Sequence, residues 1–385
     1  MKNSDIFDVL IVYTSNIAIS ASSKSTIDSA PFPVTSKYFE CNDSYGYFIE
    51  TCQKNKMTVA FTTSADIIGA GKAKSYWVYE NKKWVPVKRN CYAQQIFEKF
   101  QPVNSFQQHK RELLFSASHI QPFVDKNLNN IFADKQLIYE TFLEFSIPTV
   151  TISDNSSVGI QYSIDELNEL VEKHPNRNDF LPYLIMKDKF GSGGINVFRI
   201  TSNFPAEIDK ILKKNRDTSF VLQPFVKFDK GFQYKNNEGF TEVRFLQHGK
   251  ETVQIYLSVA SKDTFICNQN GGSIPLKKGE IPQAMYSLSK KIIKKLKNSH
   301  DIFALDFIMS NNGNVYLLEA NSSPGVVWHE DLPEDVKLKK KTMNVIAKEL
   351  ARRVNEDNHS DAQSITQNYA PNYSTYSLLQ QEIQK

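Results

Sequence analysis

The sequence predicts a mixed α/β and α+β fold, in which an α/β unit is followed by a larger α+β part. Strand and helix patterns alternate in the first third of the chain. Later apolar runs come in pairs joined by turn residues, and two of these pairs carry lysine, glycine or carboxylate side chains near their ends. With 385 residues and 41% hydrophobic composition, the chain can bury the cores of two or three subdomains.

The first third contains the elements of an α/β unit. Residues 7–13 form an apolar run that predicts a strand, and residues 45–54 have apolar residues at helical spacing. A second strand, residues 57–63, runs into small polar residues and then glycines, which is where open α/β sheets tend to bind ligands. Residues 75–87 hold two aromatic runs around Glu-Asn-Lys-Lys and predict a hairpin.

The second part begins with a helix that Asp134 is expected to cap and that ends at Ile147-Pro148, where a strand begins. Its core-facing residues are predicted to be Leu137, Ile138, Phe142 and Phe145. Further helices are expected at 163–173, 204–214, 282–297 and 334–354, and further strands at 181–187, 195–200, 219–226, 240–248 and 251–261. The polar composition after residue 355 predicts a disordered tail.

A β-hairpin is predicted near the C-terminal end of the folded part. Residues 302–309 and 315–320 are apolar and strand-forming, and the segment between them, "SNNGN", is rich in turn residues. Asp306 and Glu319 lie at similar distances from this turn, so we expect them to face each other across the hairpin. Asn321 follows Glu319 by two positions and therefore shares its face.

The three side chains of Asp306, Glu319 and Asn321 together favour a metal site. Two carboxylates and an amide oxygen are the hard ligands that magnesium prefers. A single exposed carboxylate or an asparagine at a strand end would need no such explanation. All three together, followed by the sharp turn "SSPG", favour Mg²⁺, with Mn²⁺ as an alternative.

A glycine-rich turn predicts a phosphate-binding loop. Lys187 lies near the end of an apolar strand, and residues 191–194, Gly-Ser-Gly-Gly, lead into the next one. Glycines let backbone N–H groups approach a polyanion, and the lysine supplies charge to phosphate oxygens. The segment fits neither the Walker nor the Rossmann pattern, and many such turns are merely mobile. Its position between Lys135 and the downstream carboxylates is what favours phosphate binding.

The order of these parts resembles the ATP-grasp superfamily, whose members hold ATP between two α+β subdomains. The matching segments extend from about residue 130 to residue 327 and are "DKQLIYETFLEFSIPTV", "LIMKDKFGSGGINVFRI", "FVLQPFV", "EVRFLQHGK" and "ALDFIMSNNGNVYLLEANSSPG". The resemblance implies a pre-ATP-grasp α/β domain over residues 1–120, as in glutathione synthetase-like, ribosomal-protein glutamate ligase-like and D-alanine–D-alanine ligase-like enzymes. It implies an ATP-grasp domain over 121–355, with subdomains at about 146–226 and 227–355, before the tail at 356–385.

The resemblance also implies a role for each matching residue. Lys135 and Lys187 would contact the ATP phosphates, and Gly191, Ser192, Gly193 and Gly194 would close over them. Gln223, Pro224, Phe225 and Val226 lie where the hinge strand meets adenine, although the family often has a glutamate in this region. Arg244 would stabilise the transferring phosphoryl group, with a salt bridge at the rim as the alternative. Asp306, Glu319 and Asn321 would hold magnesium. Asn268, with Gly271 and Gly272, would lie near the triphosphate, and Lys262 stands where many relatives have a basic residue.

The implied activity is that of an ATP-dependent carboxylate–amine ligase. Such an enzyme forms an acyl phosphate from an amino acid, a peptide or a protein side chain, and an amine then displaces phosphate. The alternative is a nucleotide-binding regulatory or peptide-modifying protein without free amino-acid ligase activity. Trp328 and His329 are expected either near the acceptor entrance or in loop packing.

The composition limits the remaining possibilities. A net charge of +4 without an aromatic basic stripe argues against a nucleic-acid partner. No stretch has the length of a membrane-spanning helix, and the lysine-rich residues 282–297 are better explained as a helix on the core than as a membrane-surface helix. Four scattered cysteines predict reduced thiols and a cytoplasmic location. The oligomeric state stays open between a monomer and a homodimer.

Overall fold

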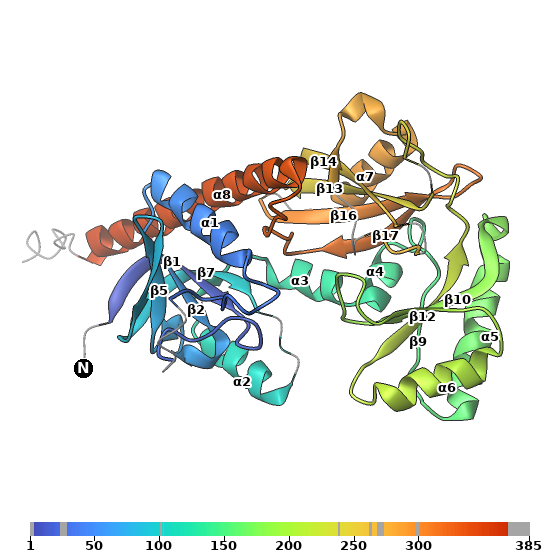
Figure 1. The fold of residues 1–385 in the computed structure, drawn as a ribbon, viewed down its shortest axis with the longest axis horizontal. Coiled ribbons are helices and arrows are strands. Elements are labelled where there is room, and N and C mark those ends of the chain that lie inside the picture. Colours follow the sequence, from blue (N-terminus) through green and yellow to red (C-terminus); the bar gives the residue numbers. More distant parts are fainter. Residues whose placement is uncertain are drawn as a thin grey trace, which may run out of the picture.

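Three β-sheets follow one another along the chain (Figure 1). The computed structural model describes residues 4–23, 29–100, 102, 104–237, 239–261, 264–267, 273–296 and 300–368. The sheets contain residues 5–122, 150–226 and 241–321, respectively. The predicted mixed α/β and α+β class is therefore confirmed, while the domain boundaries proposed above remain predictions.

The first sheet is centred on the parallel strands β1 (Asp5–Tyr13), β2 (Val59–Thr63) and β7 (Cys91–Lys99). Residues 9–12 of β1 are fully buried, as expected for a central parallel strand covered on both faces. The remaining elements are α1 (Cys41–Lys54), β3 (Ile67–Gly69), β4 (Lys72–Ala73), the hairpin β5 (Tyr76–Glu80) and β6 (Lys83–Val87), α2 (Ser105–Leu114) and β8 (Gln121–Pro122). The predicted hairpin at 75–87 is confirmed.

The second sheet has the strand order β11-β10-β12-β9 and is covered by two helices on one face (Figure 1). Its strands are β9 (Val150–Thr151), β10 (Phe180–Asp188), β11 (Val197–Ile200) and β12 (Phe220–Val226), and its helices are α5 (Ser157–Lys173) and α6 (Phe204–Lys214). Leu184 and Met186 of β10 pack against the helices. Because side chains alternate along a strand, Ile185 and Lys187 lie on the opposite face, which is turned to the third sheet.

The third sheet has the order β15-β14-β13-β16-β17 and packs on α7 (Gln283–Leu296). Its strands are β13 (Thr241–His248), β14 (Glu251–Val259), β15 (Ser273–Pro275), β16 (Ile302–Met309) and β17 (Val315–Asn321). Phe303, Leu305 and Phe307 of β16 belong to the core beneath α7. The alternation therefore places Asp306 on the opposite face, and burying it there requires a partner.

Two short helices, α3 (Lys126–Ala133) and α4 (Lys135–Thr141), connect the first sheet to the second. The Asp134 carboxylate accepts hydrogen bonds from the backbone N–H groups of Gln136 and Leu137, so the predicted cap is confirmed. Ile138 and Phe142 are buried as predicted. The prediction for Leu137 is wrong, because its side chain is 38% exposed.

The last helix, α8 (Pro333–Asn368), is longer than predicted and crosses from the third sheet to the first (Figure 1). Met343, Ile346 and Leu350 share one apolar cluster with residues of β1, α1 and β2. No glycine or proline interrupts the sequence between residues 334 and 370, so nothing in its composition ends the helix at 354. The predicted tail at 356–385 therefore begins inside α8, and residues 369–385 lie outside the described residues.

The loop after β17 also packs against the N-terminal part. Trp328 is buried, its indole lies 5.7 Å from the Tyr47 ring, and its backbone N–H donates to Ser44 Oγ. Exposed His329 lies 3.4 Å from the Glu40 carboxylate. This geometry favours loop packing over a position at an acceptor entrance.

The four cysteines are free and buried, and in the described part of the chain no helix combines the length and apolarity needed to span a membrane.

Asp179 joins the second sheet to the hairpin of the third. Its buried carboxylate accepts hydrogen bonds from Asn312 (2.6 Å), Asn314 (2.9 Å) and the Tyr316 hydroxyl (2.6 Å). Burial alone would raise the pKa of Asp179, but these hydrogen bonds outweigh burial and lower it. The polar turn of the hairpin therefore also acts as a connection between two sheets.

Asp179→Ala should lower the free energy of unfolding by about 2–4 kcal/mol, because three donors lose one buried acceptor. Asp217→Ala, at an exposed site on the same subdomain, should change it by less than about 0.5 kcal/mol. The folded pKa of Asp179 is depressed, so its contribution is complete above the unfolded pKa of about 3.9 and is lost as pH falls below that value. Urea unfolding at neutral pH and near pH 3 measures both effects; equal losses at both pH values would contradict this role.

Candidate active site

The glycine-rich turn lies beside the two predicted phosphate-binding lysines. Lys187 is next to the last residue of β10, and the Lys135 ammonium at the start of α4 donates to the Gly191 carbonyl. Gly193 and Gly194 have φ angles of +67° and +72°, a conformation that residues with a side chain rarely adopt. The predicted proximity of Lys135, Lys187 and the turn is confirmed.

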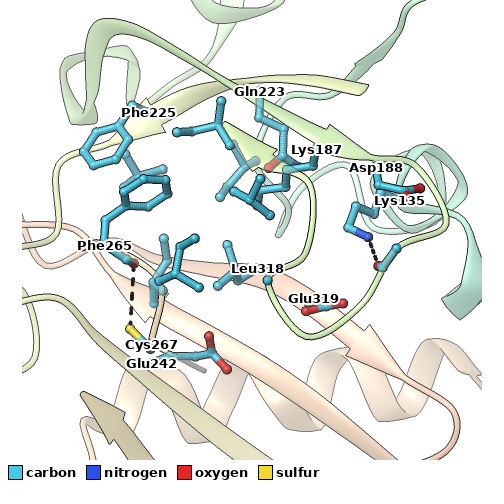
Figure 2. Close-up of a pocket in the computed structure, with 18 of the residues that line it drawn as sticks. Lys135, Lys187, Asp188, Gln223, Phe225, Glu242, Phe265, Cys267, Leu318 and Glu319 are labelled. Carbon is cyan, nitrogen blue, oxygen red and sulfur yellow. Dashed lines mark hydrogen bonds between the residues drawn. The ribbon is translucent and has the colours of Figure 1, made fainter. Parts of the chain in front are cut away.

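These residues form one end of a cavity between the second and third sheets (Figure 2). The other end is apolar and aromatic, with Phe225 and Phe265 5.5 Å apart in an edge-to-face contact. Ile185, Val226, Ile308 and Leu318 also line the cavity. An apolar slot that leads to a cationic end has the chemical layout that a purine nucleotide requires.

The hinge residues predicted to meet adenine, Gln223 to Val226, all line this cavity. The Gln223 side chain is buried, and its Nε2 donates to Thr149 Oγ1 over 2.9 Å. Its amide is thus already used to hold β12 against the segment before β9. A planar base in the slot would meet mainly the backbone and apolar side chains of β12.

The charges at the polar end influence one another strongly. Burial, together with the neighbouring charge of Lys135, lowers the pKa of the Lys187 ammonium to about 8, while Glu319 and Glu242 oppose this decrease. Burial raises the pKa of Glu319, and Asp306 adds to this increase, whereas Lys135 opposes it. Burial lowers the pKa of Lys135, against the effects of Glu319 and two aspartates. This end is therefore a cluster of partly desolvated charges poised to bind a charged group.

The three side chains predicted to bind a metal, those of Asp306, Glu319 and Asn321, lie together on one face of the third sheet. Asp306 and Glu319 are opposite each other in the register of β16 and β17. Asp306 is fully buried, and Asn321 Nδ2 donates to its Oδ2 over 2.9 Å. Arg244 from β13 donates Nε and Nη2 to the two Asp306 oxygens, at 2.5 and 2.7 Å. Arg244 is only 16% exposed, so the salt bridge that was its alternative role is present but lies inside the protein and not at the rim. Its contact with a phosphoryl group remains a prediction.

The donor set fits magnesium. In the described residues, no group of three or more His, Cys, Asp or Glu side chains could hold a metal without help. Magnesium usually takes only one or two carboxylates and completes its shell with waters and phosphate oxygens. Asp306, Glu319 and the Asn321 amide oxygen would offer that kind of partial shell beside the two lysines, with Arg244 already donating to both Asp306 oxygens. The magnesium role itself remains a prediction.

A second, larger cavity of about 600 Å³ begins at Glu319 and Asn321 and extends to the first sheet. Glu319, Asn321 and Ser192 lie on one side, and Lys99, at the end of β7, lies on the other. Lys99 Nζ donates to Ser323 Oγ (2.7 Å) and to the Pro324 carbonyl (2.8 Å). Burial lowers the pKa of Lys99 to about 7, with Lys339 adding to the effect.

Some site residues were not predicted, and some predicted ones are not placed here. Glu242 lines the cavity between the second and third sheets, two positions before Arg244 and on the same face of β13, and this acid-x-Arg spacing was the available signal. Asp188, Phe265 and Cys267 also line the cavity, and no local pattern marks them. Gly193 is in the turn but does not line the cavity. Asn268, Gly271, Gly272 and Lys262 lie outside the described residues.

One protein-family model matches the C-terminal part of the chain. Residues 275–361 match the tubulin-tyrosine ligase family. This range includes β16, β17 and the residues Asp306, Glu319 and Asn321. No curated protein sequence matches the chain.

The fold is similar to that of several ligases of known structure. D-cycloserine synthetase DcsG has a TM-score of 0.56 at 10% identity, over 90% of this chain and 99% of DcsG. D-alanyl-alanine synthetase A from Vibrio cholerae has a TM-score of 0.55 at 11% identity, over 91% of this chain and 99% of its own. The ATP-grasp ligase PsnB, in complex with a precursor variant, Mg and ADP, has a TM-score of 0.50 at 9% identity, over 90% and 100%. The chain therefore has the fold of the ATP-grasp ligases.

Proposed function

We propose that the protein is an ATP-dependent carboxylate–amine ligase that forms an amide bond and releases ADP and phosphate. The observation that carries this proposal is the convergence of Lys135, Lys187 and the glycine turn on the opposed carboxylates Asp306 and Glu319. The ligase names of the similar structures, and the Mg and ADP bound to PsnB, support the same reaction class.

Each group of site residues has its own chemical role in the proposed reaction. Bound ATP would supply the phosphoryl group that activates a carboxylate, and magnesium would neutralise phosphate charge at Asp306, Glu319 and Asn321. Lys135 and Lys187 would hold positive charge on the phosphate side of the cavity, and the glycine turn would cover the phosphates and exclude water from them. Arg244 offers a planar fork with two parallel donors, which suits a phosphoryl group as well as it suits Asp306.

The acid and the amine are proposed to meet in the larger cavity. It shares Glu319, Gly191 and Ser192 with the nucleotide cavity, so a substrate there would lie next to the reacting phosphate. Lys99 supplies a partly buried ammonium with no carboxylate within ion-pair distance among the described residues, so a substrate carboxylate would be attracted to that wall. Free amino acids, peptides and protein side chains all carry such a group.

A ligase and a nucleotide-binding protein without turnover predict different results in one experiment. Enzyme, Mg-ATP and single acids are incubated with hydroxylamine, which replaces the natural amine, and hydroxamates are detected by mass. Hydroxamate formation with a defined set of acids, together with ADP release, is expected for the ligase. ATP binding without acid-dependent ADP release, across amino acids and peptides, would support the regulatory alternative.

Glu319→Gln should fold normally and bind Mg-ATP at least about tenfold more weakly, because one anionic oxygen is lost while the shape is kept. Binding is measured by calorimetry with and without magnesium, and folding by thermal unfolding. Glu251→Gln, an exposed substitution at the start of β14, is the matched control and should bind as the wild type does. A large drop in melting temperature for Glu319→Gln alone would show that Glu319 is structural.

Arg244→Lys should slow hydroxamate formation by about 100-fold and leave ATP affinity within a few-fold of wild type. Lysine keeps the charge beside Asp306, so the variant tests the planar fork without leaving Asp306 unpaired. Arg244→Ala is less informative, because removing one partner of a buried ion pair costs about 3–5 kcal/mol of stability. A wild-type rate of hydroxamate formation in the Arg244→Lys variant would show that Arg244 does not act at the reacting centre.

Residues 191–194 should gain amide-exchange protection when Mg-ATP binds. The turn has two glycines at positive φ and no large side chain to pack, so bound phosphates would supply new partners for its backbone N–H groups. Peptides from the turn at residues 310–314 serve as the internal control, because hydrogen bonds to Asp179 already hold that segment. Unchanged protection at 191–194 under saturating Mg-ATP would contradict a phosphate-covering role.

A further inference from the structure

A groove of about 520 Å³ lies outside the proposed active site, between α8, β14 and α7. In Figure 1 the N-terminal end of α8 lies beside β14. The floor of the groove is apolar and includes Ile255, Leu276 and Leu338. None of its lining residues lines either of the two cavities described above.

Lysine side chains surround this floor. Lys278, Lys337 and Lys341 line the groove against a single acid, Glu334. All three lysines are exposed, and within the described residues no carboxylate lies at ion-pair distance from any of them. Lys278 Nζ lies 4.1 Å from the centre of the Tyr286 ring, which holds this ammonium at the edge of the groove. The groove therefore carries a net positive charge, because three lysines face one glutamate.

The groove also contains an open strand edge. β15 pairs with residues 256–258 of β14, and the Leu276 N–H continues this contact to the Ile255 carbonyl. In the described part of the chain, no strand pairs with residues 251–254 on the side away from β13. Residues 252–255 line the groove. An extended peptide can use such an edge for backbone hydrogen bonds.

We propose that this groove binds an extended, acidic polypeptide segment of a partner protein. The segment would add to the open edge of β14, place an apolar side chain on the floor, and direct its carboxylates to Lys278, Lys337 and Lys341. The three features require this chemistry together: an inorganic anion would leave the floor and the strand edge unused, and an apolar peptide would leave the lysines unpaired. The inference stands apart from the proposed ligase reaction and needs no nucleotide.

Fluorescence anisotropy with the full-length protein tests the proposal. The probe is a fluorescein-labelled peptide that alternates glutamate with valine, and the comparison peptides alternate glutamate with glycine or lysine with valine. The glutamate–valine peptide should bind most tightly and weaken as salt is added. Exchange protection at residues 251–255 should rise when it is bound, which reports the strand edge directly.

The combined substitution Lys337→Glu and Lys341→Glu should weaken this binding at least about tenfold, because two attractive contacts become repulsive. Lys294→Glu with Lys348→Glu makes the same change in net charge at exposed sites that do not line the groove, and should bind within about twofold of wild type. Circular dichroism checks that α8 is retained. If it is not, Lys278→Glu tests the opposite wall of the groove.

Three results would overturn the proposal. Equal losses in the two double variants would show general charge attraction rather than a groove. Equal affinity for the glutamate–valine and glutamate–glycine peptides would show that the apolar floor is not used. Competition by an oligonucleotide that binds more tightly, and is lost in the same groove variant, would assign the surface to nucleic acid.

Discussion

The whole site depends on the pairing of the Asp306 carboxylate inside the protein. It lies on the only face of β16 that the core beneath α7 leaves available, and it is fully buried. An isolated buried carboxylate would become neutral, so Arg244 on the neighbouring strand holds it with two hydrogen bonds. Asn321 adds a third, and Glu319 stands opposite. The sheet register thus decides which charges meet.

This charged face needs a second sheet to become a site. β10 and β12 bring Lys187, the glycine turn and an apolar wall over it, and α4 brings Lys135. The two sheets are held together at the far end of the hairpin by Asp179, whose acceptors bind the turn at residues 310–314. The contact between the two sheets is therefore held by polar groups that do not themselves line the cavity.

The long helix α8 relates the third sheet to the first. Its apolar face shares a core with β1 and α1, and buried Glu349 accepts from both Arg352 and Arg353. Burial opposes ionisation of Glu349, but these two arginines lower its pKa to about 2, so the cluster stays ionised across the physiological range. Arg353 also donates to the Phe123 carbonyl and contacts Asp301, which connects segments from the first and third sheets. The position of Lys99 opposite Glu319 follows from this docking.

The sequence by itself determined the local parts: the paired strands, the capped helix at Asp134, the turn at residues 310–314 and the facing of Asp306 and Glu319. Those features depend on side-chain period and turn chemistry, which operate over a few residues. It did not determine that Arg244 binds Asp306, that Asp179 holds the turn, or that Lys99 contacts Ser323, since these partners are 62, more than 130 and 224 residues apart. The helix predicted from the sequence also ended earlier than α8 does, because the surface that stabilises this helix belongs to the first sheet. Only tertiary structure brings such distant residues within hydrogen-bond range, because no short-range pattern encodes which buried charge will face which.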